Sequence, residues 1–156
     1  MNRALADAAR ELALADPARE PLRFAFGLAC VTRVGHLLEE PRAIACVATL
    51  RRFVAGDVRR EILDEAAQEI GALANSHRGS NSIDGSAHAA VSATYAAANA
   101  LAGRALEAAS YAAYAAVYAY GGYAVRDPSA FEPEFEWQLQ TLNSLAKAAA
   151  AAGAKA

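Results

Sequence analysis

The sequence predicts an all-α fold, a single-domain, alanine-rich bundle of about six helices. Of the 156 residues, 44 are alanine, the strongest helix former and a side chain that buries little area. No segment alternates apolar and polar residues as a half-buried strand does, and prolines and glycines divide the chain into helical stretches. We therefore expect helices that pack closely through small side chains around one core, over residues 1–149.

The first half of the chain divides at its prolines and glycines. Residues 2–15 predict a short amphipathic helix that ends before Asp16 and Pro17, and residues 21–149 predict the main bundle. The stretch 21–38 is apolar on most sides, which predicts the central and most buried helix. A helix over 42–55 follows and ends at Gly56, after which Asp57 is the expected cap of the next helix.

The segment 78–85 has the composition of a loop and separates the two halves. Beyond it we expect helices over 86–102 and 104–120, each ended by a glycine, and a last helix over 134–149. Residues 150–156 have nothing to bury and are expected to fray. Within 104–120, helical spacing predicts a seam that faces a partner helix; its members are Leu106, Ser110, Ala113, Val117 and Tyr120.

Charge and hydropathy exclude two classes of partner. The net charge of −2 is too small for the basic face that nucleic-acid binding needs. The longest uncharged stretch, 108–125, is mostly alanine and tyrosine and contains two glycines, so we expect no membrane span. Charged residues interrupt the first fifteen positions, unlike a signal peptide. We expect a cytoplasmic protein in which Cys30 and Cys46 are free thiols.

We expect no catalytic residue, cofactor or metal, because the usual enzyme motifs are missing. Helical di-iron proteins place a glutamate three residues before a histidine. The residues three positions before His36, His77 and His88 are Arg33, Ala74 and Gly85, none of which is a glutamate. In an alternative interpretation, the chain is a small ligand- or metal-binding bundle or enzyme. In that case His77 and His88 share one metal, and Asp84 orients His88.

Two arginines on the predicted central helix need partners if they are buried. A buried guanidinium requires a carboxylate or several carbonyl oxygens to offset its desolvation. We expect Arg23 and Arg33 to form internal ion pairs with a glutamate, such as Glu69 or Glu107. In the alternative interpretation they line a ligand pocket together with His36.

Two stretches are candidate protein-binding surfaces. A second stripe on 104–120 consists of Tyr111, Tyr114 and Tyr118, about 100° from the seam. Tyrosines of this kind form either a partner-binding face or the wet rim of a core. The second candidate is an acidic, aromatic stretch that would dock onto a basic partner surface, such as the active face of a nuclease; its members are Phe131, Glu132, Glu134, Glu136 and Trp137.

A competing interpretation of the acidic stretch remains open. Acidic residues favour the start of a helix, because they interact with its dipole. Phe135 and Trp137 would then close the core, and no docking face would be needed.

Several short segments resemble one family of helical proteins. They are Ala29-Cys30-Val31-Thr32-Arg33-Val34, Pro41-Arg42-Ala43-Ile44, Phe53-Val54-Ala55-Gly56, the alanine- and tyrosine-rich stretch 87–124, and Trp137-Gln138 with Leu142. In these segments the chain resembles the immunity proteins found beside bacterial polymorphic toxins, which are alanine-rich and all-helical. The resemblance implies a non-enzymatic antitoxin role, in which the chain binds and neutralises a cognate toxin. A structural helical subunit that forms homo-oligomers is the remaining alternative.

Overall fold

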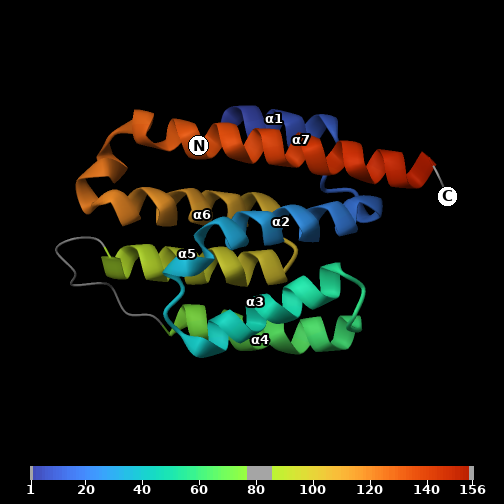
Figure 1. Cartoon of the computed structure of the whole chain (residues 1–156), viewed down its shortest axis with the longest axis horizontal. Coiled ribbons are helices and arrows are strands. Elements are labelled where there is room, and N and C mark those ends of the chain that lie inside the picture. The colour runs from blue at the N-terminus through green and yellow to red at the C-terminus, as the bar shows by residue number, and fades with distance from the viewer. Residues whose placement is uncertain (1, 77–85, 155–156) are drawn as a thin grey trace.

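The computed structural model describes residues 2–76 and 86–154, which form an all-α bundle (Figure 1). The described part contains seven α-helices and no strand, which confirms the predicted class; about six helices were expected. The helices are α1 (Arg3–Glu11), α2 (Glu20–Val34), α3 (Pro41–Val54), α4 (Arg60–Asn75), α5 (Ser86–Leu101), α6 (Ala105–Tyr120) and α7 (Glu132–Ala154). Short 3-10 turns lie between some of them, including η2 (Gly35–Leu37), η3 (Gly122–Arg126) and η4 (Pro128–Phe131).

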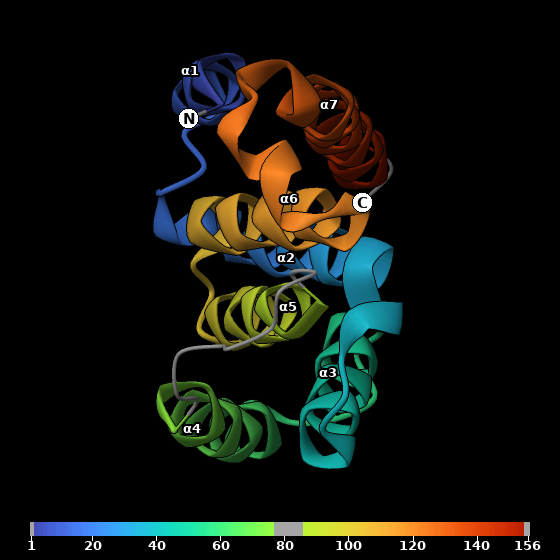
Figure 2. The ribbon, with the colours of Figure 1, turned by 90° about the vertical axis from the view of Figure 1, so that its left-hand side faces the viewer.

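The helices are arranged in three layers (Figure 2). The middle layer contains α2, α5 and α6, with α1 and α7 on one side and α3 and α4 on the other. The most extensive helix pair is α5 with α6, and α2 packs against both. Phe26, Cys30 and Val31 of α2 have no exposed area, so α2 is the central helix that the sequence predicts.

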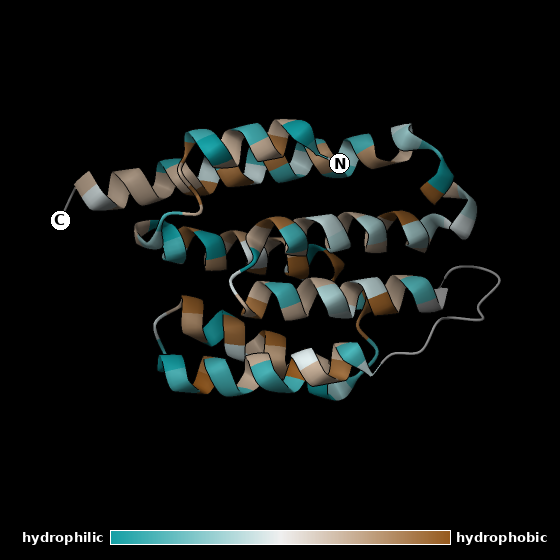
Figure 3. Ribbon diagram, turned by 180° about the vertical axis from the view of Figure 1, so that it is seen from behind, coloured by the Kyte–Doolittle hydropathy of each residue, from teal (hydrophilic) through white to brown (hydrophobic). Residues whose placement is uncertain are grey.

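Hydrophobic and hydrophilic residues are mixed along most helices, as expected for amphipathic elements on both sides of a core (Figure 3). The last turns of α7 differ, because they are almost entirely alanine and project beyond the other helices (Figures 1 and 3). Within residues 2–76 and 86–154, no helix combines the length and apolar character that crossing a bilayer requires.

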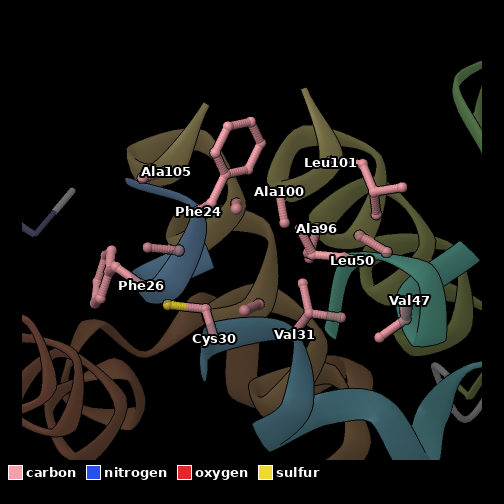
Figure 4. Packing of buried hydrophobic residues seen from close by; sticks show 14 of the residues in the cluster. Phe24, Phe26, Cys30, Val31, Val47, Leu50, Ala96, Ala100, Leu101 and Ala105 are labelled. Atoms are coloured by element: carbon pink, nitrogen blue, oxygen red, sulfur yellow. The ribbon is translucent and has the colours of Figure 1, made fainter. Parts of the chain in front are cut away.

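Small side chains bring the central helices together. Half of the buried apolar residues that the structure describes are alanines. Gly27 of α2 lies against Ala100 of α5, and a Cβ added at Gly27 would be 3.2 Å from the Cβ of Ala100. Larger side chains fill the space on either side: Val31 lies beside Ala96 and Leu50, whereas Cys30 points toward Phe26 (Figure 4). The predicted close packing is therefore present at this contact.

The ends of three helices differ from the predicted boundaries. The helix α1 ends at Glu11, because Ala13 has a left-handed conformation (φ 51°) that turns the chain and buries Leu14. Asp57 does not cap α4; its amide donates to the carbonyl of Arg52 and closes α3 after Gly56 (φ 82°). The helix α7 continues to Ala154 rather than ending near residue 149, in keeping with the helix propensity of alanine.

The contact between Gly27 and Ala100 leads to a prediction about stability. We expect Ala100→Leu to lower the free energy of unfolding by about 1–3 kcal/mol, because α2 leaves no space for a larger side chain. Ala72→Leu, at an exposed position of α4, is the matched control and should change it by less than about 0.5 kcal/mol. Urea denaturation measures both values, and equal stabilities would contradict close packing at this point.

Candidate protein-binding surface

The side chains of α5 position those of the outer face of α6. The two helices are antiparallel and are joined by a turn at Gly103 (φ 76°). His88 of α5 stacks on Tyr118 of α6, and Tyr95 stacks on Tyr111; both pairs have ring centroids 5.2 Å apart and an interplanar angle of 22°. On each helix the two partners are seven residues, or about two turns, apart. The same register therefore produces both pairs.

One of these pairs continues into a longer series of rings. Tyr118 lies 6.2 Å from Tyr114, whose ring meets Phe131 edge-on at 5.1 Å, and Phe131 lies 5.7 Å from Phe135. We call this series, from His88 to Phe135, the aromatic chain. It joins α5, α6, η4 and α7. Each aromatic contact stabilises the fold by about 0.5–1.5 kcal/mol, in addition to the effect of the apolar area that it buries. The aromatic chain therefore holds the outer tyrosines in place.

The middle of the aromatic chain reaches solvent. Tyr114 is 42% exposed and Tyr111 is 38% exposed, whereas Phe131 beneath Tyr114 is only 8% exposed. With Glu107 and Tyr118 these two tyrosines occupy one stripe of α6, which we call the outer stripe. Of the eight exposed large hydrophobic residues in the described part, five belong to α6 or η3. Exposed apolar area is thus concentrated at this side of the molecule.

The predicted seam of α6 is only partly correct. Ala113 and Val117 are buried, but Leu106 is 38% exposed and Tyr120 is 81% exposed. Leu106, Ser110 and Ala113 line a cavity of about 600 Å³ between α6, α1 and the start of α7. An alanine face contacts the neighbouring helices in place of the seam, because only small side chains fit that close; it comprises Ala105, Ala108, Ala109, Ala112 and Ala115.

The acidic, aromatic stretch does not form one continuous face. Glu132 and Glu136 are exposed, whereas Trp137 is half-buried and packs against the core. Phe131 belongs to the aromatic chain on the side of α6, as described above. The competing interpretation expected Phe135 and Trp137 to close the core; both are partly buried and pack against buried apolar clusters, while Glu132 and Glu136 remain exposed.

Glu134 has a structural partner within the chain. Its carboxylate accepts hydrogen bonds from Nε of Arg33 at 2.7 Å and from Nη2 at 3.3 Å, which joins α7 to α2. The guanidinium also lies over the ring of Trp137, 4.4 Å from its centroid. Arg33 therefore pairs with a glutamate, as expected, but neither suggested partner is correct, and Glu69 pairs with Arg42 instead. Helix α7 places next to Arg33 a carboxylate that is 101 residues away from it in the sequence.

Arg23 has no carboxylate partner in the described chain and donates instead to two backbone carbonyls. Its Nη1 bonds the carbonyl oxygens of Leu14 and Asp16, at 2.5 and 2.7 Å. These carbonyls belong to the segment between α1 and α2, and that of Asp16 also accepts from the amide of Arg19. Arg23 therefore holds the first turn against α2, and it is not among the residues that line the cavity.

Two of the three histidines lie within the described residues. His36 is exposed on η2, and His88 takes part in the aromatic chain. His77 and Asp84 lie outside the described residues, so the predicted arrangement around them is not placed. In the part of the chain that the structure describes, no three histidine, cysteine, aspartate or glutamate side chains gather as metal ligands do.

Sequence reasoning missed the contributions of Tyr95, His88 and Phe135. A signal for the first two exists, because the seven-residue spacing of His88 and Tyr95 matches that of Tyr111 and Tyr118 across the turn at Gly103. No comparable signal points to the cavity, because its walls come from segments at both ends of the chain. No protein-family model matches this chain, and comparisons with curated proteins and with solved structures find no match either.

The pair of Arg33 and Glu134 leads to a prediction. Glu134→Gln should lower the free energy of unfolding by about 1 kcal/mol at neutral pH, because the partly buried ion pair is lost. Trp137 is the only tryptophan, so its fluorescence should shift as Arg33 leaves the ring. Glu136→Gln is the control: it removes an exposed charge but keeps an acceptor for Gln140. Equal effects of the two substitutions would contradict a specific pair.

Both cysteines are buried free thiols, as predicted. Burial raises the pKa of Cys30 from an ordinary value of 9.0 to about 12; the charge of Glu134 adds to the increase, and that of Arg33 opposes it. The folded protein therefore retains the thiol proton at a pH where the unfolded chain loses it. The resulting stability is fully present below pH 9.0 and is lost as the pH rises toward 12.

We expect this loss to be visible when the wild-type chain is compared with Cys30→Ala. Between about pH 8 and pH 10, unfolding of the wild type should become easier by about 1.4 kcal/mol relative to the variant. Tyrosine ionisation affects both proteins and cancels in the difference. Urea denaturation at several pH values gives the measurement, and a difference that stays constant with pH would contradict a protected thiol.

Proposed function

We propose that this chain is a non-enzymatic, protein-binding module that neutralises a cognate bacterial toxin, and that it binds through the outer stripe of α6. The observation that carries the proposal is the exposure of Tyr111 and Tyr114 on rings that their neighbours hold in place. The resemblance to immunity proteins supplies the type of partner. The described residues offer packing area and charge at this surface, which is the chemistry that inhibition by binding requires.

Held tyrosines are suited to tight binding. A side chain that is already fixed loses little conformational freedom when a partner covers it. Tyrosine also combines a large apolar ring with a hydroxyl, and is among the residues that contribute most at protein interfaces. The stacking of Tyr111 on Tyr95 and the edge contact of Tyr114 with Phe131 provide this pre-organisation.

The charges near the outer stripe favour a basic partner. Glu107 lies on the stripe, and Glu132 and Glu136 are exposed at the start of α7. None of the three forms an ion pair within residues 2–76 and 86–154. Exposed carboxylates beside an aromatic surface speed association with a positively charged protein and exclude acidic ones. A toxin that acts on nucleic acid presents such a basic surface.

The test is protection of cells and direct binding. The chain is co-expressed with the product of each neighbouring gene, and a product that stops growth without the chain is then purified and titrated with it by calorimetry. We expect one product to be neutralised and bound at nanomolar concentrations. If the chain neutralised no product of a neighbouring gene, that result would contradict the proposal.

Tyr114→Arg tests the surface, because it places a bulky charge in the middle of the outer stripe. We expect it to weaken toxin binding by about 100-fold, the size of a central interface contact. Ile62→Arg is the matched control, since Ile62 of α4 is 39% exposed, much as Tyr114 is, but belongs to a different layer of the bundle from α6. Circular dichroism checks that both variants fold. A stable dimer of the chain alone that Tyr114→Arg dissociates would instead indicate a structural homo-oligomer.

A further inference from the structure

The cavity beside the outer stripe has mainly apolar walls. Its volume is about 600 Å³, within the range of sites that hold a ligand or a side chain. Its apolar lining residues include Leu5 of α1, Leu106 and Ala113 of α6, and Phe131 and Phe135. When an apolar group displaces water from such walls, the free energy is lowered. The cavity therefore favours an apolar occupant.

Two polar residues of the cavity wall, Asn2 and Gln138, are hydrogen-bonded to each other and to the backbone. The buried amide of Gln138 donates to the carbonyl of Ala109 at 2.7 Å, and its oxygen accepts from Asn2 at 3.3 Å. Asn2 donates further to the carbonyl of Phe135 at 3.2 Å and accepts from the amide of Leu5 at 3.1 Å. This network attaches α1 and α6 to α7, so these walls are held in position before anything binds.

The cavity has one charged residue, and it is a carboxylate. Among the residues that line it, only Glu107 carries a charge. Glu107 is exposed and forms no ion pair within the described part of the chain. A cation beside an apolar group would therefore find a partner here, and an anion in the same place would be repelled.

The cavity is also continuous with the proposed binding surface. Tyr114 and Phe131 belong both to the aromatic chain and to the cavity wall, and Glu107 belongs both to the outer stripe and to the cavity wall. A protein that covers the stripe also lies over the cavity. Interfaces of this kind place an apolar anchor in a pocket and surround it with polar contacts.

We propose that the cavity receives an apolar side chain of the protein partner, and that a lysine or arginine next to that side chain on the partner pairs with Glu107. This inference rests on the proposed function for the nature of the occupant and deepens it by naming the chemistry of the anchor. The partner's contact segment then contains a large apolar residue directly beside a basic one.

The first test uses short peptides as probes and needs no toxin. N-acetyl-Phe-Lys-amide is titrated into the isotope-labelled chain, and changes in amide NMR shifts are followed. We expect binding with a dissociation constant on the order of 1 mM, with the largest shifts at Leu5, Ser110 and Tyr114. N-acetyl-Phe-Glu-amide should bind about fivefold more weakly, and Glu107→Gln should remove the difference between the two peptides.

Ser110→Phe closes the cavity from an exposed position of α6. The substitution should weaken binding of the lysine peptide by more than about tenfold, because the new ring fills the space. The thermal stability of the protein should stay equal or become higher. Ser144→Phe is the matched control, since Ser144 of α7 is also exposed but is not among the residues that line this cavity. Peptide binding that Ser110→Phe leaves intact would overturn the inference. Benzylamine binding as tightly as the lysine peptide would also overturn it, because the cavity would then hold a small amphiphile.

The second test repeats the toxin titration with Ser110→Phe and Ser144→Phe, and only the first should lose affinity. Failures of the two proposals are distinguishable. A chain that binds the peptides in the expected order but neutralises no neighbouring product overturns the proposed function alone. A chain that neutralises a toxin but ignores the peptides, or whose affinity for the toxin survives Ser110→Phe, overturns the cavity inference alone.

Discussion

The short distance between helices α2, α5 and α6 is the constraint on which the rest of the structure depends. Gly27 and Ala100 meet where α2 approaches α5, and the inward face of α6 is lined with alanine. Alanine buries little area, so it stabilises such a core mainly by allowing backbones to approach each other. The larger buried side chains come from α2 itself and from the outer helices; they include Phe26, Leu50, Leu63, Ile70 and Leu142.

This constraint also explains why the tyrosines of α6 are on the outside. A helix that presents alanine to its neighbours must carry its larger residues on the remaining face. Tyr111 and Tyr118 then find partners on α5, while Tyr114 finds Phe131, and the rings become part of the structure without being buried. A surface that is apolar, ordered and exposed follows directly from a centre that accepts only small residues.

The sequence predicted the fold class and the central helix, because both depend on local signals such as composition, proline, glycine and helical period. It failed where contacts between distant segments decide. The seam of α6 was predicted from spacing alone, but Leu106 and Tyr120 are exposed because α5 and α2 accept alanine there. Likewise Arg33 was matched to the wrong glutamates, since no local pattern connects it to Glu134, 101 residues further along.

The candidate site was predictable to a similar extent. The stripe of Tyr111, Tyr114 and Tyr118 is visible in the sequence as residues on one side of a helix. The underlying contacts with His88, Tyr95 and Phe131 depend on the register between helices and on the path of the chain through η4. The cavity depends on α1 and α7 lying side by side, although they stand at opposite ends of the sequence.

The separation between an alanine-lined interior and a tyrosine-bearing exterior on one helix has an evolutionary consequence. Inward positions of α6 tolerate almost nothing but the smallest residues, so selection for folding fixes them. Outward positions make few demands on the backbone and are free to vary. A lineage can therefore alter whom the protein recognises by mutating one side of a single helix, while the architecture that presents that side is inherited unchanged.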